Sequence, residues 1–196
     1  RQRQMCIRDR PKEIYWTLNK KLKNNLEKKI RVIPNFPKKG IQFQDITSIT
    51  DSKQLFTEVV NEISKYCKKN KFTKVAGIEA RGFIFGSAVA YKLGLPFIPI
   101  RKKGKLPGKI VKQKYKLEYG MDEIQVHKHS ITSRDKVLIV DDLIATGGTA
   151  NAAAKLISKL GVKKIEFFMI IDLWNLEGSK KISKSYQIRS LMKAEG

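Results

Sequence analysis

The sequence predicts an α/β fold in which a mostly parallel central sheet is flanked by helices. From residue 74 onward, short apolar segments alternate with segments of helical periodicity, and this order is typical of parallel strands joined by helices. The length of 196 residues suits one α/β domain. No apolar run approaches the roughly 20 residues that span a bilayer, and the first residues lack the apolar core of a signal peptide. We therefore expect a cytoplasmic protein without a membrane segment.

The N-terminal part divides into a tail, a helix and a loop. Residues 1–11 have no periodicity and a composition unlike the rest, so we expect a non-native or disordered tail before a single domain over residues 12–196. An apolar residue at every fourth position predicts a helix over residues 14–30. Prolines and glycines predict a structured loop over residues 31–50.

The remaining elements follow from shorter signals. Ser52 is a typical N-cap before a helix with one apolar side, and Gly94 and Gly161 end two later helices. These two helices are expected over residues 83–93 and 149–160. Strands are expected over residues 75–78, 97–100, 137–140, 165–171 and 186–188. Ligands of such sheets bind beyond the carboxyl ends of the strands. The loops at those ends are 79–82, 141–149 and the basic segment 101–120, which lacks helical periodicity and is interpreted as an extended flap.

The formal net charge of +23 suggests nucleic-acid binding at first sight. However, the chain has 32 lysines and only 9 arginines, and four of the arginines lie in the first ten residues. The lysines are spread over nearly every segment, whereas nucleic-acid readers concentrate arginine, whose planar fork fits phosphates and bases. The two cysteines, Cys6 and Cys67, form no metal-binding or redox motif, and we interpret Cys67 as a buried thiol. These observations argue against specific nucleic-acid binding and against a disulfide framework.

The segment from Val137 to Thr149 carries the strongest chemical signal. An apolar strand delivers two adjacent carboxylates, Asp141 and Asp142, and a loop of small and hydroxyl residues then enters a helix. Glycines let backbone N–H groups approach an anion, and the helix N-terminus adds partial positive charge. Carboxylates suit sugar hydroxyls and hydrated Mg²⁺ instead. A Walker loop and a dinucleotide fingerprint are both absent. The segment therefore indicates a sugar-phosphate site, with the phosphate held by Ala145, Thr146, Gly147, Gly148 and Thr149.

This segment resembles the signature of the type I phosphoribosyltransferases, which bind phosphoribosyl pyrophosphate (PRPP). The resemblance implies that Asp141 and Asp142 contact the ribose hydroxyls, and that the loop 145–149 holds the phosphate on the far carbon of the ribose. It also implies the fold of that family, with an N-terminal base-binding loop and a mobile hood loop. Mg²⁺ as the cofactor and a homodimer are further implications of the resemblance.

Other segments resemble the adenine-specific branch of that family. Residues 35–47 resemble its base-binding loop, and residues 79–86 resemble its pyrophosphate loop. Residues 100–108 and 115–120 resemble its hood. The base contacts implied are Gln42, Phe43, Gln44 and Leu176, and the further PRPP contacts are Glu79, Ala80 and Tyr119. The family often has arginine in place of Gln44, and the substitution matters for affinity if that side chain packs over the base.

The resemblance also implies a mechanism. A ring nitrogen of the base attacks the anomeric carbon while pyrophosphate leaves, so the products are AMP and pyrophosphate when the base is adenine. Arg81, Arg101 and Lys105 would stabilise the departing pyrophosphate together with Mg²⁺. Glu118 resembles the general acid/base that handles the purine proton. Tyr119 would help the hood to exclude water.

Two alternatives stay open at this point. In one, the base is guanine, hypoxanthine or xanthine, although base recognition by residues 35–47 and the alanine-rich helix after Thr149 favour adenine. In the other, the chain is a PRPP-sensing regulator that binds nucleic acid, which the positive charge suggests. Residues 1–30 are too short for a winged-helix domain, and a regulator has no need for Glu118. We therefore expect small-molecule partners and a homodimer, with no membrane or nucleic-acid partner.

Overall fold

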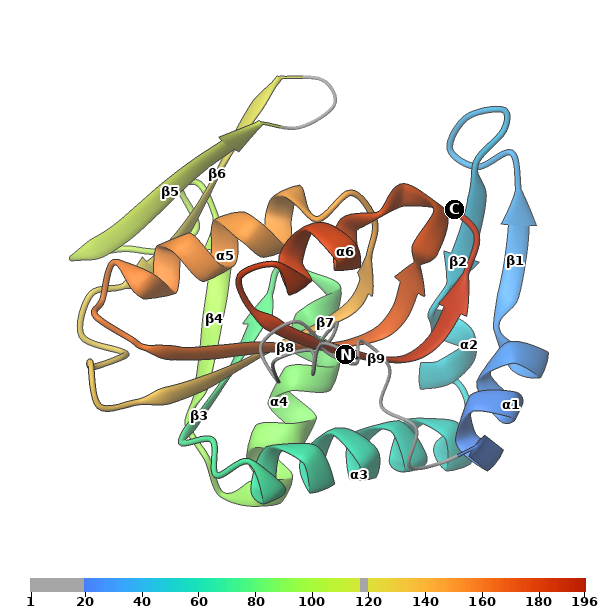
Figure 1. Ribbon diagram of the computed structural model, residues 1–196, viewed down its shortest axis with the longest axis horizontal. Coiled ribbons are helices and arrows are strands. Elements are labelled where there is room, and N and C mark those ends of the chain that lie inside the picture. The colour runs from blue at the N-terminus through green and yellow to red at the C-terminus, as the bar shows by residue number, and fades with distance from the viewer. Residues whose placement is uncertain (1–19, 117–119) are drawn as a thin grey trace, which may run out of the picture.

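The computed structural model describes residues 20–116 and 120–196. Its centre is a seven-stranded sheet (Figure 1), formed by β3 (Lys74–Ile78), β4 (Phe97–Lys102), β5 (Ile110–Lys116), β6 (Met121–His127), β7 (Lys136–Ile144), β8 (Lys164–Leu173) and β9 (Gln187–Ala194). The spatial order is β5–β6–β4–β3–β7–β8–β9. Strands β4, β3, β7, β8 and β9 run parallel, and β5 and β6 are antiparallel additions at one edge. The predicted mostly parallel sheet is confirmed.

Helices cover both faces of this sheet (Figure 1). On one face lie α1 (Lys20–Lys29), α3 (Lys53–Lys69) and α4 (Arg81–Leu93), and on the other lie α5 (Gly148–Ser158) and α6 (Gly178–Ser183). Each face has its own apolar cluster. Val59 and Phe85 belong to the first cluster, and Ala153 and Phe167 belong to the second. Apolar burial on both faces explains why the strands read as continuous apolar runs in the sequence.

Helix α3 forms where its N-cap residue and its apolar stripe predict it. The side chain of Ser52 accepts a hydrogen bond from the Leu55 backbone N–H at 3.3 Å, which satisfies one free donor of the first turn. Leu55, Val59 and Ile63 recur at every fourth position and are fully or almost fully buried. Cys67 continues this buried stripe and has no solvent exposure, so the interpretation of a buried thiol is confirmed.

Glycines allow α4 to lie very close to the sheet. A Cβ atom on Gly82 would lie 2.7 Å from the Val140 carbonyl oxygen and 2.9 Å from Asp141 Oδ1. A Cβ atom on Gly77 of β3 would lie 2.7 Å from the Gly82 carbonyl oxygen. Because side chains do not fit at such distances, only glycine permits this packing. The first turn of α4, which begins at Arg81, is thereby held against the end of β7.

The segment predicted as a structured loop, 31–50, contains regular structure. β1 (Arg31–Pro34) pairs antiparallel with β2 (Gln42–Asp45), and the short helix α2 (Thr47–Thr50) follows. All four residues of β1 are exposed. The alternation of buried and exposed side chains that marks a strand in a sequence is therefore missing here, which is why the hairpin was not predicted.

Several other boundaries differ from the prediction, and three of the differences bear on the site. β7 continues to Ile144, paired with Asp172 of β8, so the two acids of the motif lie in a strand and not in a loop. Helix α4 begins at Arg81 and not at residue 83. Strand β6 was missed because half of its residues are polar, and it turns the predicted flap into an antiparallel hairpin with β5. None of the helices in the described ranges combines the length and the apolar character that crossing a membrane requires.

Candidate active site

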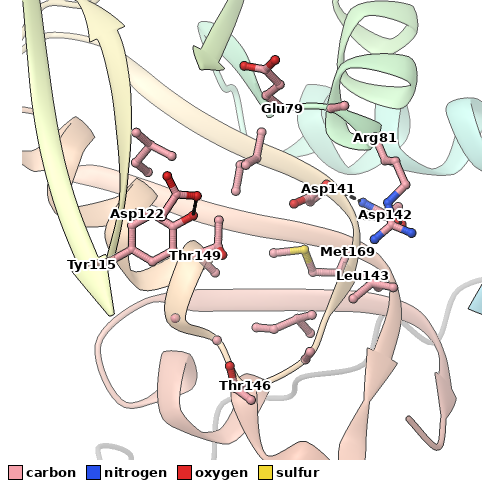
Figure 2. Close-up of a pocket in the computed structure, with 18 of the residues that line it drawn as sticks. Glu79, Arg81, Tyr115, Asp122, Asp141, Asp142, Leu143, Thr146, Thr149 and Met169 are labelled. Carbon is pink, nitrogen blue, oxygen red and sulfur yellow. Dashed lines mark hydrogen bonds and ion pairs between the residues drawn. The ribbon is translucent and has the colours of Figure 1, made fainter. Parts of the chain in front are cut away.

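A cavity lined by most of the predicted site residues, called the main cavity below, lies beyond the carboxyl ends of β3 and β7, where the predicted loops meet. Its volume is about 300 Å³. Figure 2 shows acidic, basic and hydroxyl side chains pointing into it from the residue after β3, the start of α4, β5, β6, β7 and the segment that opens α5. The residues predicted from the sequence that line it are Glu79, Ala80, Arg81, Asp141, Asp142 and Ala145, Thr146, Gly147, Gly148 and Thr149. The structure thus brings together segments that lie about 60 residues apart in the chain, as their register on adjacent parallel strands requires.

The loop 145–148 leads directly into the N-terminus of α5. Gly147 has φ +82° and is the N-cap of the helix. The first turn of a helix presents N–H groups that have no partner within the helix, and the helix dipole favours an anion there. Thr146 and Thr149 add hydroxyl groups beside these donors. This geometry fits a phosphate group.

The first residue of α6 supports the phosphate loop from behind. The Gly178 backbone N–H donates to the Ala145 carbonyl oxygen at 3.0 Å. A Cβ atom on Gly178 would lie 2.1 Å from that oxygen and 2.6 Å from the Gly147 nitrogen. The loop therefore keeps its shape only while position 178 has no side chain.

The two acids of β7 lie at the opposite wall of the cavity (Figure 2). Burial raises the pKa of the Asp141 carboxyl well above its usual range, and the Asp142 charge adds to this rise. Burial also raises the pKa of Asp142, although Arg81 opposes that shift. Arg81 Nε lies 3.1 Å from Asp142 Oδ2, and that oxygen accepts no hydrogen bond from the described residues. The pair therefore suits a ligand that donates hydroxyl groups or brings positive charge.

Glu79 connects the cavity to β4. Its carboxylate accepts hydrogen bonds from Arg101 Nε at 3.1 Å and from the Lys102 backbone N–H at 2.8 Å. The Arg101 hydrogen bond is the main reason why the pKa of Glu79 lies below its usual value. Arg101 and Lys105 are not among the residues that line the cavity in this structure, whereas Lys102 is. The roles predicted for Arg101 and Lys105 remain predictions.

Tyr115 and Asp122 line the cavity but were not predicted as site residues. They face each other in the register of β5 and β6, and the Tyr115 hydroxyl donates to Asp122 Oδ2 at 3.2 Å (Figure 2). Burial is the main reason why the pKa of Tyr115 is raised. The sequence signal that would have found them is the glycine at 120, which allows a tight turn between two strands of alternating residues.

The residues of the β1–β2 hairpin that are predicted to contact the base lie on opposite faces of β2. The Phe43 ring lies beside Arg81, with 6.0 Å between the ring centroid and Cζ; Arg81 lines the main cavity, whereas Phe43 does not. Gln42 and Gln44 line a second cavity of about 380 Å³ between the hairpin and β9. Gln44 is buried and donates from Nε2 to the Glu195 carbonyl oxygen at 3.0 Å.

The remaining predicted residues lie elsewhere. Leu176 belongs to the 3-10 turn Trp174–Leu176 and packs against the same apolar cluster as Leu143, a cavity residue. Trp174 at the start of this turn is 44% exposed. Glu118 and Tyr119 lie outside the described residues.

Known proteins share both the sequence and the fold. The model of the phosphoribosyl transferase domain matches residues 44–192. An adenine phosphoribosyltransferase of Clostridium botulinum is 48% identical over 168 residues, which is 86% of this chain and 97% of the relative. The chain belongs to the adenine phosphoribosyltransferase family. Every residue that lines the main cavity falls inside the range matched by the domain model, whereas Gln42 and Phe43 precede it.

Solved adenine phosphoribosyltransferases have the same architecture. The structure from Thermoanaerobacter pseudethanolicus is 42% identical with a TM-score of 0.83, and the match covers 88% of this chain and 99% of that one. The structure from Trypanosoma brucei in complex with AMP, pyrophosphate and ribose-5-phosphate is 26% identical with a TM-score of 0.83, over 95% and 86% of the two chains. The type I phosphoribosyltransferase fold is therefore confirmed.

Proposed function

We propose that the protein transfers the phosphoribosyl group of PRPP to adenine, giving AMP and pyrophosphate in purine salvage. The observation that carries this proposal is that a phosphate loop, two adjacent acids and Arg81 line the same cavity. A phosphate loop alone would suit many ligands. The added acids select a ligand with sugar hydroxyls, and the arginine provides for a second group of phosphates.

PRPP is assigned to the cavity in three parts. Its 5-phosphate occupies the loop 145–149 at the N-terminus of α5, and its ribose hydroxyls donate to Asp141 and Asp142. Its pyrophosphate lies toward Glu79, Ala80 and Arg81. Asp142 Oδ2 supports the ribose assignment, because it is buried and pairs with Arg81 but accepts no hydrogen bond from the described residues, so a ribose hydroxyl can donate to it.

Adenine is assigned to the side of the cavity near the hairpin. The Phe43 ring is the flat surface on which the purine stacks, and its position beside Arg81, which lines the cavity, supports this assignment. Leu176 covers the base from the turn that follows β8. The backbone around Gln42 and Gln44 reads the edge of the base, because their side chains point toward the second cavity.

In the reaction, a ring nitrogen of adenine forms a bond to the anomeric carbon as the bond to the pyrophosphate oxygen breaks. Positive charge develops on the ribose, and Asp141 and Asp142 stabilise it. Arg81, Arg101 and Lys105 stabilise the negative charge on the leaving pyrophosphate. Glu118 accepts the proton that the base nitrogen loses, and Tyr119 helps to keep water away from the reacting carbon.

Mg²⁺ fits this site as an ion bound mainly by the substrate. No group of three or more His, Cys, Asp or Glu side chains in residues 20–116 and 120–196 is arranged to hold a metal by itself. Mg²⁺ is commonly bound by substrate phosphates, water and one or two carboxylates, and the acids of the cavity satisfy that requirement. When bound, the ion neutralises charge on the pyrophosphate.

We also propose a cytoplasmic homodimer. The phosphorylated substrate and product carry several charges and do not cross membranes unaided, which supports the location. The dimer is supported by the outer side of α4, where Ile84 is 41% and Tyr91 is 91% exposed. Exposed apolar side chains on one helix are typical of a surface that another protein covers.

The test is an assay of the purified protein with PRPP, Mg²⁺ and each purine base in turn. Formation of AMP from adenine alone is the expected result. Product from guanine, hypoxanthine or xanthine instead would move the specificity to another purine. PRPP binding without any product, with a salt-sensitive complex on oligonucleotides, would replace the enzyme by a PRPP-sensing regulator.

A further inference from the structure

Two elements assigned to the base are far apart in the chain, namely β2 with Phe43 and the turn Trp174–Leu176. The residue pair Glu195–Gly196, which follows β9, lies between them. Figure 1 shows the end of the chain beside β2 and next to the segment that follows β8. We call this pair the 195–196 segment.

On the hairpin side, the contact is a buried hydrogen bond. Gln44 Nε2 donates to the Glu195 carbonyl oxygen at 3.0 Å, and the residue is only 5% exposed. A buried amide donor that loses its partner costs about 1–3 kcal/mol. The position of β2 is therefore coupled to the position of the 195–196 segment.

On the other side, the segment contacts the turn through backbone and side chain. The Gly196 N–H donates to Asn175 Oδ1 at 3.1 Å, and Asn175 Nδ2 donates to the Gly196 carbonyl oxygen at 3.4 Å. A Cβ atom on Gly196 would lie 3.1 Å from Leu176 Cδ1 and 2.9 Å from Leu173 Cδ1. The backbone of Gly196 thus packs directly against the leucine that is assigned to the base.

The same turn leads into the support of the phosphate loop. Gly178, two residues after Leu176, donates to the Ala145 carbonyl oxygen and packs against Gly147. Contacts therefore run without a break from the phosphate loop through the turn and the 195–196 segment to Gln44.

We propose that the 195–196 segment fixes the distance between the two walls of the base site, and that Gln44 and Asn175 are positioning residues that act through it. This inference rests on the proposed function, because it concerns the site assigned to the purine. The Gln44 side chain bonds to the segment and lines the second cavity, so it acts on the base from behind the hairpin.

The test is a double-mutant cycle with Gln44→Leu, Asn175→Ala and the two combined. Gln44→Leu removes one hydrogen bond to the segment and Asn175→Ala removes two. Each single variant is expected to raise the KM for adenine about 3- to 10-fold, the order expected for the loss of such bonds, with kcat and the KM for PRPP unchanged. The KM for adenine of the double variant is expected to be no higher than that of the more strongly affected single variant, because both substitutions release the same segment. Gln44 bonds to Glu195 and Asn175 bonds to Gly196, so a coupling between the two side chains is expected to pass through residues 195–196.

Conservative variants and controls sharpen the result. Gln44→Arg keeps an N–H donor, and the second cavity of about 380 Å³ provides room for it. Gln44→Arg is expected to restore the low KM. Asn175→Asp keeps the acceptor for the Gly196 N–H but loses the donor to the Gly196 carbonyl oxygen, so it is expected to restore only part of the effect. Asn24→Ala on the exposed side of α1 is the matched control for an exposed asparagine.

The inference is overturned if the two single effects multiply, or if the KM for PRPP rises as much as the KM for adenine. Amide hydrogen exchange of residues 42–45 gives a second readout that needs no turnover. Faster exchange in Asn175→Ala is expected even if the wild-type protein makes no AMP, in which case only the proposed function fails. Unchanged exchange in Asn175→Ala, with AMP still formed by the wild type, refutes the 195–196 segment as the link and leaves the proposed function intact.

Discussion

The phosphate pocket and the β1–β2 hairpin provide the two halves of the assigned site, but they are held in different ways. The pocket residues stand at the ends of core strands, and glycines at 82 and 178 fit against its backbone at distances that no side chain allows. The hairpin has only two strands, β1 is exposed throughout, and Gln44 is its one buried residue. The core therefore determines the geometry of the sugar-phosphate half, whereas a few separate contacts determine the geometry of the base half.

The largest effect is expected from a residue that belongs to neither half. Glu118→Gln removes the proposed proton acceptor and should lower kcat about 100- to 10,000-fold, the usual range for general acid/base catalysis. PRPP affinity should stay the same, because the change leaves the pocket intact. Single-turnover kinetics and calorimetric PRPP binding measure the two quantities. An unchanged kcat removes Glu118 from the mechanism.

Next in size is a change behind the pocket. Gly178→Ala places a Cβ atom where the Ala145 carbonyl oxygen lies, so the phosphate loop must move. Overpacking of about 1–3 kcal/mol corresponds to a loss of up to about 100-fold in PRPP affinity. Isothermal titration with PRPP checks this, with Lys181→Ala on the exposed side of α6 as the control. Normal PRPP affinity in Gly178→Ala would show that the phosphate loop can bind its ligand with a side chain at position 178.

Asp141→Asn should separate activity from stability within the pocket. Loss of a hydrogen bond to a charged group, about 1.5–3 kcal/mol, predicts kcat/KM about 10- to 100-fold lower. Because the pKa of Asp141 is raised in the folded state, this carboxyl favours folding below its ordinary pKa, and that contribution is lost as the pH rises through the folded-state value. At neutral pH the variant should therefore be the more stable protein, by about 1.4 kcal/mol for each unit of the raised pKa.

Urea denaturation at neutral and at acid pH tests the stability part of that prediction. The gain should be present at neutral pH, should shrink as the pH falls from the raised folded-state pKa towards the ordinary pKa of a carboxyl group, and should be absent below that ordinary value. A variant that is less stable than wild type at neutral pH would mean that Asp141 contributes to folding as an anion.

A smaller effect, limited to one substrate, is expected in the hairpin. Phe43→Ala removes the ring on which the base is proposed to stack and should raise the KM for adenine about tenfold, within the 1–3 kcal/mol of base stacking. The KM for PRPP should not change, because Phe43 does not line the phosphate pocket. Steady-state kinetics with Val32→Ala, an exposed residue of the same hairpin, as control checks this. Equal increases in the KM for adenine and the KM for PRPP would contradict the view that the hairpin and the phosphate pocket bind their ligands independently.

The smallest effect is expected from the ion pair across the hairpin. Arg31 Nη2 lies 2.9 Å from Asp45 Oδ2, and a hydrogen bond from Thr47 is the main reason why the pKa of Asp45 is lowered. A lowered pKa adds stability above the ordinary value, and this is lost as the pH falls through the folded-state value. Asp45→Asn should cost less than about 1 kcal/mol at neutral pH, since Arg31 is exposed. Thermal melts should show the difference vanish in acid and shrink in salt.

The sequence predicted the parts of the molecule in which local and tertiary signals agree. Apart from β5 and β6, the strands from Val75 to Ile171 and their helices followed from apolar runs and glycine caps, and the phosphate loop followed from its glycines beside two acids. The residues from Glu79 to Arg81 joined that loop because adjacent parallel strands end at the same edge. These predictions depend on burial, which leaves a clear pattern in the residue types.

The sequence did not predict features that depend on partners distant in the chain. β1 has no buried side, and the side chains of β6 include buried Glu123 and Gln125, so neither shows the expected alternation. Tyr115 and Asp122 enter the cavity only because β5 and β6 pair in one register. The orientation of Gln44 away from the main cavity likewise depends on Glu195, 151 positions later.

Trp174 gives the protein a built-in optical reporter. The chain contains two tryptophans, Trp16 and Trp174, and Trp174 begins the turn between the phosphate loop and the base wall. Indole emission responds to the polarity and to the quenching groups around the ring. With Trp16 replaced by phenylalanine, the tryptophan fluorescence of the intact protein comes from this turn alone. Arrival of a purine and departure of the nucleotide can then be followed in real time without an attached dye.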